Sequence, residues 1–564
     1  MSVIASSTVQ LTSSTFTGNR AHDTSSAIYA LGTGTNTITN CTFSENVALV
    51  GSTISLLFAD TTAENITMQN NECSADSCNI FVSFSTVNIL DSTMTTTTYP
   101  GGQTSLLDAL NNNNGASGYF LSISAGSTII ILNTDFSNGF ASNGGLVYMS
   151  GNSEMIISGS SFTRGYANLN GGGIYASSFK TLYIINCNFV DNMAYNGGSA
   201  IFISSGTVRF ESSSIIATPN YNAVYIVGGS YSSNDIQYST GTELYLDNED
   251  QILGAAIYSS NPESFSITNN TFTQLEYAYQ GGAVYLTMTS AERATGIPTS
   301  PVCVIDTCTF TSNKATFGGA LYVSGVNYVK VTNSSFTSNV AQKGTDGGNG
   351  GALYYSSSDQ NSQIVFESGV TFNSNIADDS GGAVYWDYNQ PINLTTPSYN
   401  GNRATLYGNN YGCFAQVLKS ITSAVYYSQT TIRRHLSNAT LSGSTSLALS
   451  DQQSGGQIQA IYLALFDEFD QIVGSDSTST VTIAFSNDYS NETYTPSITG
   501  STTVTVQKGV VKFDTIRLTA EPAQSYQLAF STTGIDATKP SNANYLLNNS
   551  LSNTSMSFNV SLRA

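Results

Sequence analysis

The sequence predicts an all-β protein in which a right-handed parallel β-helix, a single-stranded solenoid, is followed by a small β-sandwich. An aromatic motif recurs with five intervals of 25 to 27 residues, a glycine-rich motif accompanies it, and both motifs stop after about residue 413. Beyond that point, short alternating strands with turn residues replace the repeat. We therefore expect a β-helix over residues 1–415, a connector over 416–440 and a sandwich over 441–564.

The aromatic motif is F-x-x-N, and Met68 with Asn71 forms a variant of it. A repeat of this length suits one coil of three short strands, and equivalent residues of successive coils then stack about 4.8 Å apart. A column of stacked aromatic residues would fill the interior. Asparagine tolerates the left-handed conformation and can form a ladder with its copies. The predicted core column consists of Phe16, Phe43, Phe136, Phe162, Phe189, Phe272, Phe310, Phe336 and Phe372.

The glycine-rich motif, G-G-[AILSV]-[IVL], lies a short distance after the phenylalanine and usually ends in an aromatic residue. Glycine supplies turn conformations that other residues reach only with strain. An α-solenoid would instead need helix-forming residues and a period of 3.6. Copies of the motif begin at Gly144, Gly172, Gly197, Gly281, Gly318, Gly350 and Gly381.

The composition restricts the function. Only 10% of the 564 residues are charged and the net charge is −20, which argues against nucleic-acid binding and against docking on anionic lipid. No apolar run is long enough to span a membrane. The N-terminus lacks the features of a signal peptide. Because the repeat begins within the first ten residues, we expect the sequence to be a fragment of a larger cell-surface protein.

Seven cysteines do not suggest a disulfide framework, because the number is odd. Two pairs share a C-x4-C spacing and are candidates for disulfides in an oxidising compartment. Three cysteines lie two residues before the phenylalanine, where alternation predicts a buried position. The only histidines, His22 and His435, are far from these pairs, so we expect no metal site and no cofactor. The disulfide candidates are Cys73 with Cys78 and Cys303 with Cys308, and the buried register holds Cys41, Cys187 and Cys308.

The C-terminal part opens with the apolar run 461–473. This run, together with K-G-V-V-K-F-D-T-I-R-L and S-Y-Q-L-A-F, resembles the Ig-like repeats of bacterial invasin-type surface proteins. Asp467, Glu468 and Asp470 are candidate Ca²⁺ ligands, but a polar turn between strands is the interpretation that we favour.

A search for catalytic groups leads us to expect no enzyme. Asn133-Thr134-Asp135 matches a short piece of the polygalacturonase pattern, but the other residues of that pattern are missing nearby. Glycosidases need two carboxylates about 5 to 9.5 Å apart. The candidate acids, Asp378 with Asp379 and Asp247 with Glu249 and Asp250, fall in loops where acidic side chains are usually only solvated.

Ten N-x-[ST] sequons are candidate glycosylation sites. Four of them place the asparagine three residues before the phenylalanine or Met68, at a predicted turn, so glycans would line one ridge of the helix. The alternative is that asparagine suits the turn and the sequon is accidental. The sequon asparagines are Asn40, Asn65, Asn269, Asn333, Asn393, Asn438, Asn491, Asn548, Asn553 and Asn559, of which the first four share the phase.

Over roughly residues 5–415, the paired G-G-A-[IVL] and F-x-x-N motifs resemble the repeats of the polymorphic outer membrane protein family of chlamydial surface adhesins. The resemblance implies a β-helical surface protein. We expect an extracellular or cell-surface structural or adhesive protein, either a glycosylated fibre subunit or a fragment of a large surface protein. Its expected partners are further copies joined head to tail, other surface proteins or glycans. The alternative is a carbohydrate-binding or carbohydrate-active β-helix that uses its 33 tyrosines to stack on sugars.

Overall fold

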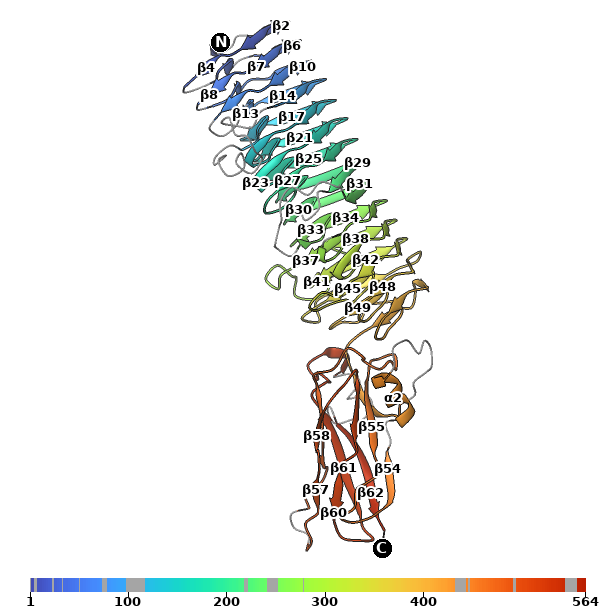
Figure 1. Ribbon diagram of the computed structural model, residues 1–564. Coiled ribbons are helices and arrows are strands. Elements are labelled where there is room, and N and C mark those ends of the chain that lie inside the picture. The colour runs from blue at the N-terminus through green and yellow to red at the C-terminus, as the bar shows by residue number, and fades with distance from the viewer. Residues whose placement is uncertain are drawn as a thin grey trace.

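The computed structural model describes the chain except for residues 1, 5–7, 23–24, 33, 50, 74–78, 98–116, 218–221, 241–251, 277, 432–442, 445–446, 490–492, 543–554 and 564. Figure 1 shows an elongated stack of coils followed by a second, separate β-body at the C-terminal end. Nearly every described element is a strand, so the predicted all-β class and the parallel β-helix are confirmed. None of the described helices is long and apolar enough to cross a membrane.

One coil shows how the repeat folds. Strand β41 (Leu321–Ser324) leads through a corner to β42 (Tyr328–Thr332), which is followed by β43 (Ser335–Thr337) and β44 (Val340–Ala341). The chain then returns to β45 (Leu353–Ser356), which lies parallel to β41 with Tyr322 opposite Tyr354. Each strand therefore pairs with its copies in the coils before and after it.

Repetition of this unit builds long sheets. Strands such as β42 and β43 form a sheet of 25 strands, and those equivalent to β44 form one sheet of six and two sheets of three. Strands equivalent to β41 form a parallel sheet of 15, which we call sheet A. Sheet A contains β1 (Ser2–Ile4), β5 (Ile28–Leu31), β9 (Ile54–Leu57), β13 (Ile80–Ser83), β16 (Leu121–Ser124), β20 (Val147–Met149), β24 (Ile174–Ser177), β28 (Ile201–Ser204), β30 (Val224–Val227), β33 (Ile257–Ser260), β37 (Val284–Thr287), β41, β45, β49 (Val384–Trp386) and β52 (Tyr411–Gly412).

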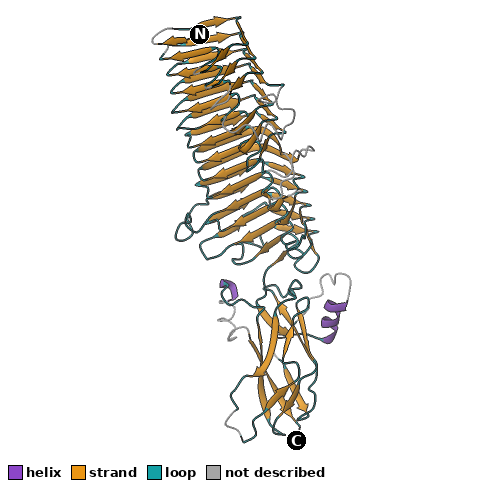
Figure 2. Ribbon diagram, turned by 60° about the vertical axis from the view of Figure 1, so that its left-hand side comes forward, coloured by secondary structure: helices purple, strands orange, loops and turns teal. Residues whose placement is uncertain are grey.

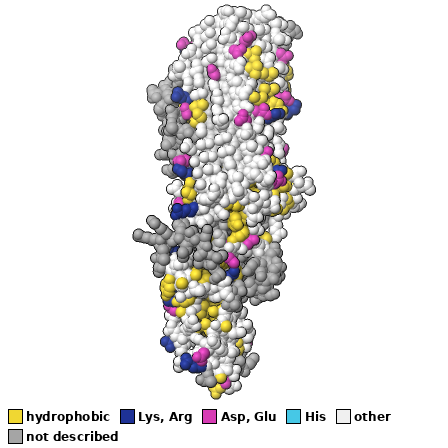
Figure 3. Space-filling model, turned by 90° about the vertical axis from the view of Figure 1, so that its right-hand side faces the viewer, with side chains coloured by type: hydrophobic (Ala, Val, Ile, Leu, Met, Phe, Trp, Pro, Cys, Tyr) yellow, Lys and Arg dark blue, Asp and Glu magenta, His cyan; other side chains and the backbone are white. Residues whose placement is uncertain are grey.

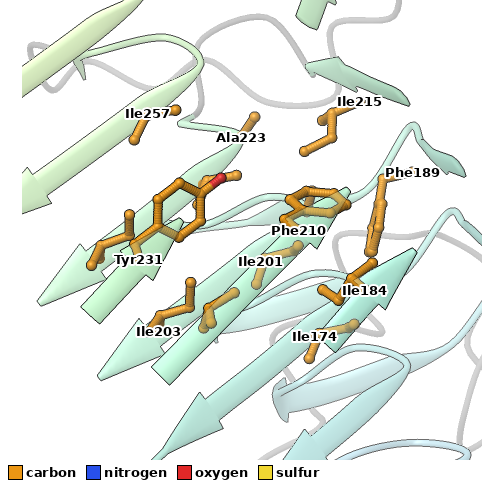
Figure 4. Close-up of a cluster of buried hydrophobic side chains, with 14 of the residues drawn as sticks. Ile174, Ile184, Phe189, Ile201, Ile203, Phe210, Ile215, Ala223, Tyr231 and Ile257 are labelled. Carbon is orange, nitrogen blue, oxygen red and sulfur yellow. The ribbon is translucent and has the colours of Figure 1, made fainter. Parts of the chain in front are cut away.

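The interior is filled by side chains stacked in columns. Eight of the nine predicted phenylalanines have 0% exposure, and the first of them, Phe16, is half-buried. Adjacent rings lie face to face, as Phe310 and Phe336 do with centroids 4.6 Å apart. Where the phenylalanine is missing, Met68, Met94 and Tyr238 continue the column. Figure 4 shows isoleucines and aromatic rings from successive coils converging on this core.

The C-terminal body is a β-sandwich with a hydrophobic core of its own. One sheet has the order β53-β55-β59, the other β54-β62-β61-β56-β58, and β57 pairs with β60. The region predicted to be a connector contains strand β53 and helix α2. The elements are β53 (Val417–Ser420), α2 (Ser423–Thr431), β54 (Ala448–Gln452), β55 (Ile461–Phe466), β56 (Thr480–Phe485), β57 (Ser497–Thr499), β58 (Thr503–Thr505), β59 (Val510–Phe513), β60 (Arg517–Thr519), β61 (Ser525–Thr532) and β62 (Ser555–Leu562).

Loops of the sandwich face the last coil of the β-helix (Figures 1 and 2). The Phe469 ring lies edge-on to Tyr411, 4.5 Å between centroids, and to Trp386 at 5.8 Å. The Gln471 side chain donates to the Tyr411 carbonyl oxygen at 3.1 Å, and that of Asn542 donates to the Ala415 carbonyl oxygen at 3.2 Å. Side-chain contacts and hydrogen bonds therefore join the two bodies.

Candidate functional site

The asparagine of F-x-x-N forms a buried ladder along the helix axis. The backbone N–H and the side-chain N–H of Asn313 both donate to Oδ1 of Asn339, each at 3.0 Å, and Asn339 repeats these bonds to Asn375. The remaining side-chain N–H of Asn339 donates to the Phe310 carbonyl oxygen at 3.1 Å. Each side-chain amide therefore links neighbouring coils and binds backbone N–H and carbonyl groups at the corner after the phenylalanine. The ladder was predicted, and its role is structural.

The asparagine of F-x-x-N does not have the left-handed conformation. The expectation that asparagine occurs here because it tolerates that conformation is therefore wrong. The residue before the asparagine has the positive φ, as Ser312 (56°) and Ser338 (56°) show. The asparagine is selected instead because its amide can both accept and donate within one buried column.

A second column of polar side chains occupies the corner three residues before the phenylalanine. Asn40, Asn65, Asn269 and Asn333 lie there, all exposed and all with φ between 47° and 53°. Asn40 and Asn65 belong to adjacent coils, and Asn65 Nδ2 donates to Asn40 Oδ1 at 2.6 Å. Because a left-handed corner favours asparagine, the conformation alone accounts for the residue type. Occupation of these sequons stays a prediction.

The other sequons do not share this column. Asn393 is exposed with φ 58°, and Asn559 is exposed in strand β62. The remaining candidates, Asn438, Asn491, Asn548 and Asn553, lie outside the described residues.

Sheet A carries a third column, the aromatic ladder, on its outer face. It is formed by the aromatic residue that ends the glycine-rich motif and by its equivalents. Ring centroids of neighbouring coils lie 4.3 to 5.4 Å apart, and all but the last pair are stacked. The glycine-rich motif carried the signal, but its aromatic residues were not predicted to form one column. The aromatic ladder consists of Tyr148, Tyr175, Phe202, Tyr225, Tyr258, Tyr285, Tyr322, Tyr354 and Tyr385.

The stacking determines which parts of the aromatic rings are exposed to solvent. Because each ring faces the rings above and below it, ring faces point along the axis and edges and hydroxyls point away from the sheet. Stacking on a sugar needs a free ring face. The aromatic ladder therefore does not provide the platform on which the carbohydrate-binding alternative depended.

The ladder reaches the domain junction at Asp387. Its Oδ2 accepts hydrogen bonds from Ser356 Oγ at 2.8 Å and from Tyr354 OH at 3.3 Å, and its Oδ1 accepts one from Ser357 N at 3.1 Å. Burial raises the pKa of this carboxyl. Lys539 of the sandwich donates to the Asp387 carbonyl oxygen and lies over the Phe414 ring, 4.4 Å from its centroid. These contacts position the junction.

The described cysteines are buried thiols. Cys41, Cys187 and Cys308 face inward at a corner, and each Sγ donates to the carbonyl oxygen two residues earlier at 3.2 to 3.3 Å. Burial raises the pKa of Cys187 to about 11 and that of Cys308 to about 12. Cys303 is also buried and free, so the predicted bond between Cys303 and Cys308 is not formed.

The reason is geometric: Cys303 lies in β38 (Cys303–Asp306) opposite Phe265 and Val329, whereas Cys308 lies beyond the next corner. Residues 74–78 are outside the described part, so the structure does not describe a Cys73–Cys78 pair.

The acidic residues considered as catalytic candidates form local hydrogen bonds and ion pairs where the structure describes them. The Lys343 backbone N–H donates to Asp378 at 3.0 Å, and its ammonium lies 3.2 Å from Asp379. Asn133-Thr134-Asp135 spans a corner, with Thr134 buried and the other two exposed. Asp247, Glu249 and Asp250 lie outside the described residues.

The predicted calcium candidates form a turn. Asp467 is 1% exposed, and its Oδ1 accepts the backbone N–H groups of Phe469 and Gln471, both at 2.9 Å. Burial raises the pKa of this carboxyl to about 7. Asp470 is exposed and pairs with Lys419. Within the described residues, no three His, Cys, Asp or Glu side chains are grouped so as to hold a metal ion.

Comparisons with known proteins agree with this interpretation of the repeat. The Chlamydia polymorphic membrane protein repeat matches residues 307–324 and 369–385. The chain is 30% identical to the probable outer membrane protein pmp6 of Chlamydia pneumoniae over 246 residues, 42% of this chain and 17% of that protein, so it spans about a sixth of the relative's length. Among solved structures, WR4, a C. elegans MSP family member, is 17% identical with a TM-score of 0.13, over 21% of this chain and 92% of that one. That likeness is too weak to carry an argument. The repeat region is therefore Pmp-like, and the two sequence matches support the predicted cell-surface localisation.

Proposed function

We propose that the chain is a structural or adhesive part of a cell-surface protein, in which the β-helix displays a polar, glycan-bearing ridge. The observation that carries this proposal is the column of exposed asparagines at left-handed corners, with sequon hydroxyls on the outward side of the next strand. The relative is itself described as a probable outer membrane protein. Figure 3 shows that the visible face is mostly neither charged nor hydrophobic, as expected of a surface exposed to water.

The proposal favours surface proteins or glycans as partners over head-to-tail copies. Joining two solenoids end to end pairs the backbone edges of their terminal coils. At the C-terminal end, Phe469 and Gln471 of the sandwich contact the last coil, so a second solenoid would have to displace them. Negative-stain images of native material that show filaments built from stacked coils would contradict this choice.

The test of the glycan ridge uses sequon hydroxyls, so that the corner asparagines remain in place. Thr42→Val and Thr67→Val remove the sequons of Asn40 and Asn65 and keep a residue that suits a strand. Thr309→Val is the matched control, because it has the same strand position without a sequon.

The chain and its variants are secreted from eukaryotic cells, and glycopeptides are measured by mass spectrometry. We expect glycans on Asn40 or Asn65 of the wild-type protein and of the control, lost in the matching variant. If the asparagines at all four corner positions carry no glycan, the proposed glycan-bearing ridge is refuted. Adhesion is tested by measuring how the labelled protein binds to cell surfaces. Saturable binding that the Val substitutions do not change would support adhesion through protein contacts. The absence of saturable binding would contradict an adhesive role.

A further inference from the structure

We propose that the aromatic ladder is a site of oxidative cross-linking, in which neighbouring tyrosines of successive coils couple to dityrosine, chiefly Tyr225 with Tyr258. This modification is separate from glycosylation and from adhesion. It follows from the spacing of phenol rings on the outer face of sheet A.

The geometry brings phenols together in series. Six consecutive positions of the ladder, from Tyr225 to Tyr385, are tyrosines. Tyr225 and Tyr258 are paired directly across parallel strands β30 and β33, and their ring centroids are 4.3 Å apart with an interplanar angle of 17°. The other tyrosine pairs of the ladder are separated by 5.0 to 5.4 Å. The closest pair is therefore the expected centre of coupling.

The reaction is a two-electron oxidation and needs an oxidant, which we name as hydrogen peroxide acting through a haem peroxidase. Each phenol loses one electron and one proton to give a phenoxyl radical. The radicals join through a carbon–carbon bond between positions ortho to the hydroxyls, and each ring then regains aromaticity as its ortho hydrogen moves to oxygen. Hydrogen peroxide takes up the two electrons and two protons and yields two waters.

The surroundings of Tyr225 and Tyr258 favour coupling between these two rings over coupling to another protein molecule. Both rings are only partly exposed, so their edges can give up electrons to an oxidant at the surface while a second protein cannot stack on their faces. Burial raises the pKa of Tyr225 above its ordinary value of 10.0, so the phenol that reacts at neutral pH is the protonated one and its radical forms by loss of an electron and a proton. The parallel register holds both radicals side by side. The product would join two coils covalently, in a protein whose described cysteines are all free.

The experiment treats the whole chain with peroxidase and hydrogen peroxide and then cleaves it at acidic residues. Asp247, Glu249 and Asp250 lie between the two tyrosines in the sequence, so cleavage there yields two peptides that stay joined only if the rings have coupled. We expect a linked peptide pair, lighter by two hydrogens than the sum, from protein that remains monomeric in gel filtration.

Tyr258→Phe keeps a stacked ring but cannot form the second phenoxyl radical, and we expect it to lose the linked pair. Tyr175→Phe is the matched control, because its ladder neighbours are Tyr148 at 5.2 Å and Phe202 at 5.0 Å. It should keep the wild-type amount of linked pair. Circular dichroism checks that both variants keep the β-helix.

Two outcomes would overturn the proposal. One is dityrosine found only in covalent dimers, through exposed residues such as Tyr195 and Tyr494. The other is an equal amount of intramolecular dityrosine in the wild-type protein and in Tyr258→Phe.

Discussion

At the scale of single residues, each buried asparagine of F-x-x-N satisfies backbone groups that the corner would otherwise leave without a partner. Asn339 accepts from Asn313 and donates to Asn375 and to the Phe310 carbonyl oxygen. A buried polar group without a partner costs about 1–3 kcal/mol. The repeat keeps this residue because no apolar side chain of similar size could replace its bonds.

Replacing Asn339 by alanine should lower the free energy of unfolding by about 3 kcal/mol or more, because it leaves the backbone and side-chain N–H groups of Asn313 without this acceptor and removes one hydrogen bond to the Phe310 carbonyl oxygen. Urea unfolding followed by circular dichroism measures the change.

Asn333→Ala is the matched control in the same coil. Asn333 is exposed with φ 47°, so its replacement should cost only about 1 kcal/mol, the strain of a left-handed alanine. Equal losses in the two variants would show that the buried ladder contributes nothing beyond the corner conformation.

Two buried cysteines should respond differently to serine. Cys308 lies in a column where Ser334 donates to the carbonyl oxygen two residues earlier at 2.8 Å, so Cys308→Ser should change stability by less than about 1 kcal/mol. Cys303 lies between Phe265 and Val329, so Cys303→Ser should cost about 1–3 kcal/mol for a buried hydroxyl without a partner.

Unfolding curves of the two serine variants, compared at the same urea concentrations, test this pair. A larger loss of stability for Cys308→Ser than for Cys303→Ser would refute the view that only Cys308 lies where a hydroxyl can find a hydrogen-bond acceptor.

At the scale of the element, the second glycine of most copies of the glycine-rich motif is required because the backbone of the next coil lies too close for a side chain. A Cβ atom on Gly319 would lie 2.2 Å from the Gly351 carbonyl oxygen, and one on Gly351 would lie 2.0 Å from that of Gly382. The backbones of successive coils leave no room for a methyl group there. The first glycine of the motif is required for another reason, since Gly318 has φ +62°.

Gly319→Ala should therefore force neighbouring backbone apart and destabilise the β-helix by about 3 kcal/mol. Gly18→Ala is the control, because Gly18 has φ +65° but a Cβ atom added there would meet no atom within 4 Å, and it should cost only about 1–2 kcal/mol. Thermal unfolding of the two variants distinguishes a clash from backbone strain alone, and a smaller loss for Gly319→Ala than for Gly18→Ala would refute the clash.

The sequence predicted the coil because its columns depend on local alternation and a constant register. The register survives the longer interval between Phe336 and Phe372, since the extra residues lie in the loop between β44 and β45 and in the connections between β45 and Phe372. The aromatic ladder escaped prediction because it needs the register of sheet A, whose copies are separated by loops of variable length. The left-handed position was assigned to the asparagine because spacing does not show which corner residue turns the chain.

At the scale of the whole molecule, the decisive contacts join segments that are remote in sequence. Phe469 lies against Trp386 and Tyr411, more than 50 residues before it, and nothing in a local pattern specifies that pairing. The sandwich thereby covers hydrophobic residues of the last coil. The turn that carries Phe469 depends on Asp467, whose carboxylate is almost completely buried beside the junction.

The stability of this junction should decrease as the pH rises through about 7. The pKa of Asp467 is raised by burial to about 7, above its ordinary value of 3.8, so its neutral form favours the folded state. Below pH 4 the group is protonated in both states and this contribution is complete. Between pH 4 and 7 the unfolded state gains progressively from ionisation, by about 1.4 kcal/mol for each pH unit.

Asp467→Asn should remove this pH dependence, because the amide oxygen can still accept from Phe469 and Gln471 without ionising. Asp476→Asn is the control, since Asp476 accepts the N–H groups of Thr478 and Ser479 in a similar turn that is less buried. Urea unfolding at pH 5 and pH 8, followed by fluorescence of Trp386 beside Phe469, measures the junction. The wild-type protein and Asp476→Asn should lose stability between these pH values and Asp467→Asn should not. The same loss in all three proteins would assign the pH dependence to other groups.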